Sequence, residues 1–258
     1  SIISINLNNA EGLKATIESV INQDFTDYEY IIIDGGSTDG SLEVIQQYSN
    51  KISYWVSEPD KGIYHALNKG IAKARGKYCL FLNSGDFLYS SSILANIFKN
   101  SSGEDVLYGN IRFGDQKEVL MLSNTLSFNT FLGDSICHNA SFIKRELFNR
   151  FGFYNENYKI SSDWEFFVNT LIKHKCSYRH IGELVTIMQP GGISTNPKYA
   201  AILMQERMEA IKRVLPEFYD TAVEYYELKN ELPYYRSSRL VQLIKKIQQS
   251  NLYQLIRK

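Results

Sequence analysis

Two kinds of apolar segment alternate through the first 82 residues of the chain. Runs of mainly apolar residues predict four strands, at 2–7, 28–34, 52–57 and 77–82. Apolar residues at helical spacing predict three helices between them, at 12–22, 41–48 and 64–75. The second run is apolar throughout at its centre, as expected for a parallel strand covered on both faces. This alternation indicates right-handed crossovers and a mostly parallel sheet in an α/β fold.

The second half of the chain is less regular. Its pattern predicts a strand at 106–113, a strand shortly after His138, and helices at 90–99, 144–151 and 163–173. Residues 189–197 have the composition of a loop, and helical patterns follow at 199–214, 219–232 and from Arg239 onward. We expect one large domain over residues 1–215 and a helical extension over 216–258.

Composition narrows the class of protein. A chain of 258 residues with 44% hydrophobic and 13% aromatic residues can bury a sizeable core. With 28 basic and 28 acidic residues there is no overall field to attract nucleic acid, so no nucleic-acid partner is expected. Three cysteines far apart in sequence argue against a disulfide framework and favour a reducing, cytoplasmic location. No apolar run approaches the roughly 18 residues that span a bilayer.

Two carboxylates directly follow predicted strands. Asp34 precedes Gly35-Gly36-Ser37-Thr38-Asp39-Gly40, and Asp86 ends the turn Asn83-Ser84-Gly85-Asp86. Ligands of α/β proteins bind beyond the carboxyl ends of strands, so Asp34 is placed to accept hydrogen bonds from a base or ribose. The glycines would let that ligand approach the backbone closely. The alternative is an ordinary strand-to-helix turn that Thr38 or Asp39 caps, and the glycine spacing is not the dinucleotide-binding fingerprint.

A third motif lies in Ser161-Ser162-Asp163-Trp164-Glu165-Phe166-Phe167, at a predicted helix start. Serine caps and first-turn acids are favoured there without any catalytic role. Asp163 and Glu165 are two apart and face different directions on a helix, so only one is expected to point into a site. With the two earlier motifs, in this order, the segment resembles the family-2 glycosyltransferases, inverting enzymes that use nucleotide sugars. The resemblance covers about residues 1–195.

This resemblance, to the bacterial surface-polysaccharide type of the family, implies a GT-A fold. That fold has a Rossmann-like, mostly parallel central sheet with flanking helices. Residues 1–110 would form the nucleotide-binding half of the catalytic domain and residues 111–215 the acceptor half. The stretch Asp60 to Gly70 is similar to one found beside the nucleotide in a bacterial subgroup, with His65 where an acidic residue is usual. The nucleotide is therefore expected at Asn8, Asp34, Gly35, Asp60, Lys61, Asn68 and Ser84.

The turn that ends at Asp86 occupies the place of the family's Asp-x-Asp metal motif, with Asn83 and Gly85 in place of carboxylates. Mg²⁺ often takes one or two carboxylates, and substrate phosphates and waters complete its octahedron. We therefore expect Mg²⁺ or Mn²⁺ to be held through Asp86 and to bind weakly without nucleotide. A capped turn with no metal is the alternative.

The resemblance implies the mechanism and the partners. Asp163 would remove the proton of an acceptor hydroxyl, which attacks the sugar of a UDP-sugar donor with inversion. The acceptor would be a glycan or lipid-linked molecule of bacterial polysaccharide synthesis, lying near His138, Trp164, Glu165 and Gly192. The thinned metal motif leaves an inactive sugar-nucleotide-binding partner subunit as an alternative. A nicotinamide-dependent oxidoreductase is opposed by the glycine spacing.

Three features keep a structural and a functional interpretation. His138 is either a satisfied structural residue or a residue of the acceptor side, and Gly191-Gly192 is either a connecting loop or a lid. From Leu232 onward there are six basic residues and no acidic one, with apolar residues at helical spacing. This tail packs on the catalytic domain, forms a homodimer contact, or lies on an anionic membrane. In the last case the protein would be peripheral on the inner face of the plasma membrane.

Overall fold

The structure, a computed structural model, describes residues 1–99, 103–133 and 135–237. Its centre is one mixed sheet with the strand order β3-β2-β1-β4-β8-β6-β9-β5, and β7 pairs with β6. The strands are β1 (Ile2–Asn6), β2 (Tyr30–Asp34), β3 (Tyr54–Ser57), β4 (Tyr78–Phe81), β5 (Phe87–Leu88), β6 (Val106–Phe113), β7 (Val119–Leu120), β8 (Ser141–Lys144) and β9 (Tyr178–Met188). The α-helices are α1 (Ala10–Ile21), α2 (Ser41–Gln47), α3 (Ile63–Lys73), α4 (Ile93–Lys99), α5 (Phe128–Gly133), α6 (Arg145–Phe151), α7 (Ser162–Phe167), α8 (Ala200–Val214) and α9 (Tyr219–Ser237).

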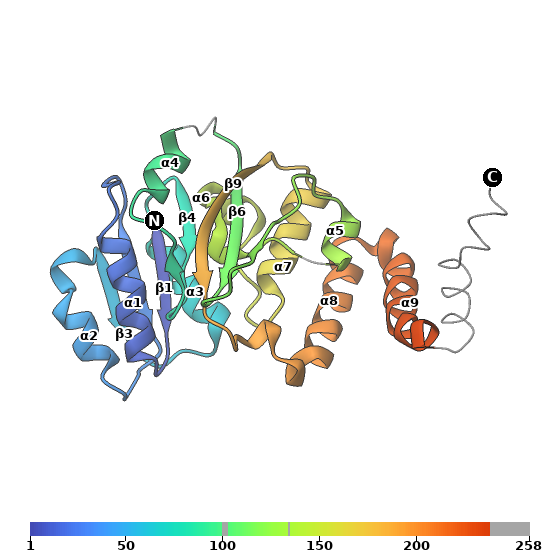
Figure 1. The fold of residues 1–258 in the computed structure, drawn as a ribbon, viewed down its shortest axis with the longest axis horizontal. Helices are drawn as coiled ribbons and strands as arrows, with labels where there is room; N and C mark the ends of the chain where they lie inside the picture. The colour runs from blue at the N-terminus through green and yellow to red at the C-terminus, as the bar shows by residue number, and fades with distance from the viewer. Residues whose placement is uncertain (100–102, 134, 238–258) are drawn as a thin grey trace, which may run out of the picture.

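The first half of the sheet is parallel, as its sequence predicts. β1 pairs in parallel with β2 and β4, and β2 with β3. Every residue of β2 is buried. Ile32 packs in one core cluster with Leu13 and Ile17 of α1, and Ile31 packs in the other with Leu67 of α3. Because helices cover both faces, an unbroken apolar strand is stable here, and the carboxyl ends of β1, β2 and β4 reach one edge of the sheet (Figure 1).

The second half of the sheet mixes directions. β8 is antiparallel to both β4 and β6, whereas β6 and β9 run parallel with a register shift near Gly109. The strand at 106–113 and the strand after His138 are confirmed as β6 and β8. β9 and α5 lie where the sequence predicts no element. The GT-A sheet is thus parallel on the N-terminal side and mixed on the other.

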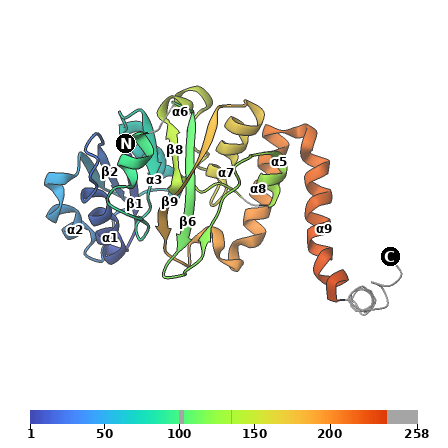
Figure 2. The same cartoon turned by 45° about the horizontal axis from the view of Figure 1, so that its top comes forward.

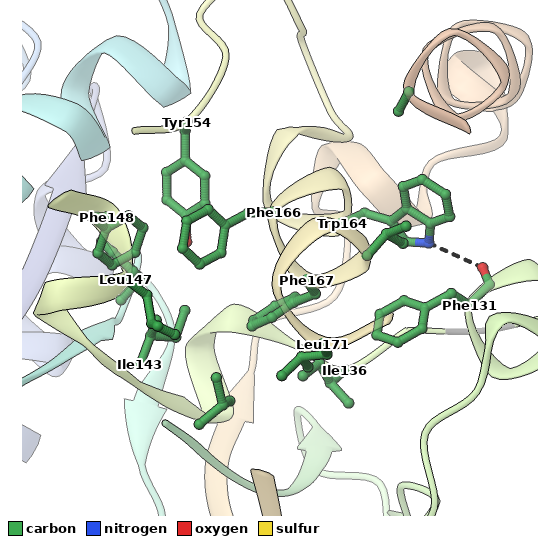
Figure 3. Close-up of a cluster of buried hydrophobic side chains, with 14 of the residues drawn as sticks. Phe131, Ile136, Ile143, Leu147, Phe148, Tyr154, Trp164, Phe166, Phe167 and Leu171 are labelled. Carbon is green, nitrogen blue, oxygen red and sulfur yellow. Dashed lines mark hydrogen bonds between the residues drawn. The ribbon is translucent and has the colours of Figure 1, made fainter. Parts of the chain in front are cut away.

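Aromatic packing fixes the position of α7 against the sheet. Phe166 stacks on Phe148 at 4.5 Å between ring centroids, and Phe148 meets Phe81 of β4 edge-on at 5.8 Å. The indole Nε1 of Trp164 donates to the Phe131 carbonyl oxygen at 3.0 Å (Figure 3). Removing a buried aromatic ring from such a cluster typically destabilises a protein by about 3–5 kcal/mol. The residues around the Asp163 position are therefore held on rigid supports.

The helix predicted at 163–173 is continuous, but its hydrogen bonding changes. After α7, residues Val168–Lys173 form a π-helical segment. The Thr170 hydroxyl donates to the Phe166 carbonyl oxygen at 2.8 Å. A threonine that bonds back to the preceding turn competes with the regular helical bond and bends the helix.

α8 and α9 form the end of the molecule opposite α1 and α2 (Figures 1 and 2). The prediction at 219–232 is confirmed as α9, whose Ala222 is fully buried. The helix predicted from Arg239 and most of the basic tail, with its predicted membrane and dimer contacts, lie outside the described residues. Among the helices that are described, none has both the length and the apolar character needed to cross a membrane.

Candidate active site

A cavity of about 500 Å³ opens at the carboxyl end of β4, between the two halves of the sheet. Its walls come from the turn after β4, from residues 135–139, from the start of α7, from the segment after β9 and from α8. The side chains that concern the chemistry are Tyr64, Asn83, Asp86, His138, Asn139, Lys159, Asp163, Trp164 and Arg207. Two of the three sequence motifs, those of Asp86 and Asp163, therefore meet at one cavity.

Both carboxylate oxygens of Asp163 have partners. Asp163 Oδ1 lies 2.8 Å from the Tyr64 hydroxyl, which is also 2.5 Å from the Ile160 carbonyl oxygen. Asp163 Oδ2 lies 3.0 Å from His138 Nδ1. Burial by itself would raise the pKa of Asp163, but its contacts with His138 and Tyr64 and the Trp164 N–H outweigh burial and hold that pKa below its usual value. The carboxylate is therefore ionised at neutral pH.

Asp86 is held by its own turn and by two neighbouring segments. Gly85 has φ +99°, a conformation that favours glycine. The Thr16 hydroxyl donates to the Asp86 carbonyl oxygen at 2.7 Å. The carboxylate accepts from the Gln189 N–H at 3.0 Å and from Asn139 Nδ2 at 2.9 Å. Asp86 is 7% exposed, and this burial raises its pKa despite both donors.

The donor set of this turn fits a divalent cation that takes few protein ligands. Each carboxylate oxygen of Asp86 accepts one hydrogen bond and keeps a second lone pair. Asn83 Oδ1 is buried in the same turn without a hydrogen-bond partner. Among the described residues, no cluster of three His, Cys, Asp or Glu side chains is placed to hold a metal. A hard cation here would therefore draw the rest of its ligands from substrate phosphates and water.

Asp34 and Asn8 connect the loops that follow β1 and β2. Asp34 is fully buried, and its carboxylate accepts hydrogen bonds from Asn6 Nδ2, the Ser37 and Ser57 hydroxyls and the N–H groups of Gly36 and Ser37. Burial would raise the pKa of Asp34, and these donors outweigh it and lower that pKa. Asn8 Oδ1 accepts from the Thr38 N–H at 2.8 Å. Neither side chain lines the 500 Å³ cavity.

Four further expected nucleotide residues gather at the same edge of the sheet. A Cβ at Gly35 would come within 2.6 Å of Asp60 Oδ2, so glycine lets the loop after β3 approach the loop after β2. Asp60 Oδ1 accepts from the Gly62 N–H at 2.9 Å, and Lys61 is exposed beside it. Ser84 lines the cavity, and its carbonyl oxygen accepts from Asn9 Nδ2 at 3.1 Å.

The structure does not bring Asn68 and Glu165 to the cavity. The Asn68 amide is buried, where it donates to the Tyr154 carbonyl oxygen at 2.8 Å and accepts from the Tyr154 N–H at 3.0 Å. Glu165 turns away from Asp163 and pairs with Arg213. Burial raises the pKa of Glu165 although Arg213 opposes this. Trp164 and Gly192 line the cavity.

Several residues that the structure places at the site have no predicted role. Tyr64 lies in the stretch that resembles the bacterial subgroup, and this resemblance could have indicated Tyr64 as a site residue. Asn139 follows His138 directly, but its bond to Asp86 spans 53 positions. Lys159 and Arg207 line the cavity with their charges over the rings of Tyr199 and Trp164. No local sequence pattern predicts contacts of this kind.

A larger hollow of about 830 Å³ lies at the opposite edge of the sheet, around Ser1, Glu29, Arg75 and Tyr78. It borders the starts of β1 and β4 and contains none of the three motifs. Because ligands of α/β sheets bind beyond the carboxyl ends of the strands, the cavity at Asp86 and Asp163 is the better candidate site.

A parallel half-sheet, with a turn carboxylate after β4 and a half-buried carboxylate at the start of α7 lining one cavity, is the arrangement expected of the GT-A glycosyltransferase class. Residues 1–167 match the model of glycosyl transferase family 2, and the chain belongs to this family. The family and the GT-A fold predicted from the sequence are thereby confirmed.

Relatives agree with this assignment. A PGL/p-HBAD biosynthesis glycosyltransferase of Mycobacterium bovis is 32% identical over 179 residues, which are 64% of this chain and 67% of that protein. The structure of S. aureus TarS 1-349 in complex with UDP-GlcNAc matches with a TM-score of 0.63 at 17% identity, over 83% of this chain and 67% of that one. The mannosyltransferase PcManGT from Pyrobaculum calidifontis, in complex with GDP-Man and Mn²⁺, matches with a TM-score of 0.63 at 14% identity, over 98% and 81%. At these identities the two structures show the fold.

Proposed function

We propose that the chain is an inverting glycosyltransferase that moves a sugar from a nucleoside-diphosphate sugar to an acceptor hydroxyl. One observation carries the proposal: Asp86, from the nucleotide half, and the Asp163–His138 pair, from the acceptor half, line the same cavity. A reaction between a donor and an acceptor needs both groups within reach of one reacting centre.

The donor is proposed to be a UDP-sugar that binds across the carboxyl ends of β1, β2 and β3. TarS with UDP-GlcNAc and PcManGT with GDP-Man share the fold and support a nucleotide sugar. Asp34 and Asn8 hold the loops of this edge in place, and Gly35 and Asp60 form its surface. These loops give the base and ribose a preorganised backbone rather than a freely moving one.

The metal is proposed to bind at Asp86 and Asn83, together with the donor diphosphate. When bound, a divalent cation neutralises the charge that grows on the leaving diphosphate. The contribution of the chain is to aim the carboxylate, because Asn139 and the Gln189 N–H hold its two oxygens. Gly191 and Gly192 follow Gln189 at the rim of the cavity and are proposed to close over the diphosphate.

The acceptor is proposed to be a glycan or a lipid-linked molecule of bacterial polysaccharide synthesis. A second hollow, of about 380 Å³, shares Ser135 and Ile136 with the catalytic cavity. Its wall combines apolar Met121 and Leu126 with polar Asn129. An acceptor that lay there would present its hydroxyl to the Asp163–His138 pair. Attack from the face opposite the diphosphate inverts the anomeric centre, so an α-linked donor gives a β-linked product.

The proposal is tested first by a thermal-shift screen of UDP-, GDP-, dTDP- and CMP-sugars with Mn²⁺. A ligand at 100 times its Kd adds about 2.7 kcal/mol of stability, so the donor should stand out. Asp163→Asn should then abolish turnover of that donor and leave its Kd nearly unchanged, because the amide keeps the shape of the carboxylate and loses its charge.

Glu165→Gln is the matched control, since Glu165 is two residues away and pairs with Arg213 outside the cavity. It should keep most of the turnover. An inactive Glu165→Gln with an active Asp163→Asn would contradict the proposal. A wild-type chain that binds the donor and neither transfers nor hydrolyses its sugar would be a non-catalytic partner subunit.

A further inference from the structure

The contacts of Asp163 raise the question of which atom receives the acceptor proton. One oxygen faces the Tyr64 hydroxyl at 2.8 Å and the other faces His138 Nδ1 at 3.0 Å. The Tyr64 hydroxyl donates to Oδ1, and His138 Nδ1 lies at ion-pair distance from Oδ2. Both oxygens therefore already have a partner within the chain.

The other nitrogen of His138 is placed differently. In a neutral imidazole whose Nδ1 carries the proton, Nε2 has a free lone pair and is the basic atom. His138 Nε2 lies 3.4 Å from Asn83 Nδ2, a long contact with an amide N–H that suits a lone pair at Nε2. Asn83 belongs to the turn that carries Asp86, so Nε2 faces the donor side of the cavity.

The ring of His138 is held in this orientation. Phe81 packs against it at 6.0 Å between centroids, in an edge-on arrangement. The His138 side chain is 12% exposed, so it is within reach of a ligand in the cavity and yet has little freedom to turn. A nucleophile, a base and a carboxylate that orients the base are the parts of a catalytic triad, and here the acceptor hydroxyl would be the nucleophile.

We propose that His138 Nε2 is the general base of the transfer and that Asp163 is its positioning residue; this rests on the proposed function. The acceptor O–H bond breaks and its proton moves to Nε2. The acceptor oxygen forms a bond to the anomeric carbon. The bond from that carbon to the diphosphate oxygen breaks, and the nucleoside diphosphate leaves with the electron pair. The imidazolium then returns its proton to water.

The surrounding charges favour this assignment. The groups that face His138 are Asp163 from α7, Tyr64 from α3 through Asp163, and Asp86 and Asn83 from the turn after β4. Asp163 is ionised and stabilises an imidazolium at 3.0 Å. Burial raises the pKa of Tyr64 well above its usual value, so its hydroxyl stays a donor to Asp163. The contacts of Asp163 lower the pKa of its carboxylate, which makes that carboxylate a weak base at neutral pH.

Chemical rescue tests the base directly. Hydrolysis of UDP-glucose, UDP-galactose and UDP-N-acetylglucosamine by the full chain with Mn²⁺ uses water as the acceptor, and UDP release reports it. His138→Ala should lower kcat about 10²–10⁴-fold with little change in donor Kd. Added imidazole should raise the kcat of His138→Ala at least tenfold, in proportion to the unprotonated fraction of the imidazole. Asp163→Asn should lose activity that imidazole does not restore, and His174→Ala, an exposed histidine outside the cavity, should resemble wild type.

Two results would overturn the proposal while the proposed function stands. In the first, His138→Ala hydrolyses the donor at the wild-type rate. In the second, His138→Ala loses hydrolysis activity, and excess Mn²⁺ restores that activity whereas imidazole does not. The second would make His138 a metal ligand. If the wild-type chain cleaves no donor, the proposed function is in doubt, and the ¹⁵N spectrum of histidine-labelled protein still decides on His138. The neutral tautomer with the proton on Nδ1 supports the assignment, and the tautomer with the proton on Nε2 refutes it.

Discussion

Glu206 of α8 should contribute more to stability than any exposed acid on the same helix. Its buried carboxylate accepts hydrogen bonds from the N–H groups of Lys159, Ile160 and Ser161, at 2.6, 2.9 and 2.9 Å. These residues directly precede α7, and the Ile160 carbonyl oxygen faces the Tyr64 hydroxyl. One side chain thus holds the segment that leads to Asp163.

The size of the effect follows from the number of donors. A buried donor left without a partner costs about 1–3 kcal/mol, so Glu206→Ala should lose at least about 3 kcal/mol over three N–H groups. In Glu206→Gln the amide oxygen can take the position of Oε2, which accepts from Ile160 and Ser161. Only the Lys159 N–H then faces an NH₂ group, and the loss should be about 1–3 kcal/mol.

Urea unfolding followed by circular dichroism measures both losses. Glu209→Ala is the control, because Glu209 is exposed on the same helix and bonds only to Gln205 Nε2 among the contacts described. The expected order of destabilisation is Glu206→Ala, then Glu206→Gln, then Glu209→Ala, with the last within about 0.5 kcal/mol of wild type. A loss below about 1 kcal/mol for Glu206→Ala would refute the reasoning and mean that water satisfies the three N–H groups.

Three further predictions concern the donor side. Calorimetric titration of Mn²⁺ should give little heat with the chain alone and clear binding with UDP present. Asp86→Ala should weaken the ternary complex more than it weakens the binding of UDP alone. Tight Mn²⁺ binding without UDP would contradict the single-carboxylate site. Asp34→Ala should lower UDP affinity because the loop after β2 loses its anchor. The pKa of Asp34 is lowered in the folded protein. The Asp34 carboxylate therefore stabilises the fold above about pH 4, and this stabilisation is lost as the pH falls through the folded pKa. Asp34→Asn should flatten the acid limb of a Tm–pH curve. Gly191→Ala should lower Tm more than Gly192→Ala, because only Gly191 has a positive φ, +95°, and neither site has an atom within 4 Å of an added Cβ; equal shifts would remove the backbone argument.

The parallel half of the fold could be predicted from sequence because strands buried on both faces consist of unbroken apolar runs. β2 is apolar from Tyr30 to Ile33 and every one of its residues is buried. β9 has no such apolar run along most of its length. Its first six residues are half-buried or exposed, and Gly182 has φ +71°. A strand that is polar on much of its length and interrupted by a glycine does not stand out from a loop.

The same distinction applies to the site. Asp86 and Asp163 could be proposed because each follows a local signal, a strand end or a helix start. The contact of Tyr64 with Asp163 joins residues 99 positions apart, and no spacing rule anticipates it. Asn68 shows the reverse case. Its place in a familiar stretch suggested the nucleotide, whereas its buried amide holds the backbone of Tyr154.

The position of β9 in the sheet has a consequence for how the chain is made. β9 lies between β6 and β5 although it is the last strand to leave the ribosome among those described. Until residue 188 emerges, the edge of β6 that pairs with β9 has no partner from this strand, while β1 to β4 can already associate. Such an open edge is a template for association with other chains. Nascent chains whose emerged part ends between residues 144 and 188 should therefore depend most on chaperones, and emergence of β9 should end that dependence.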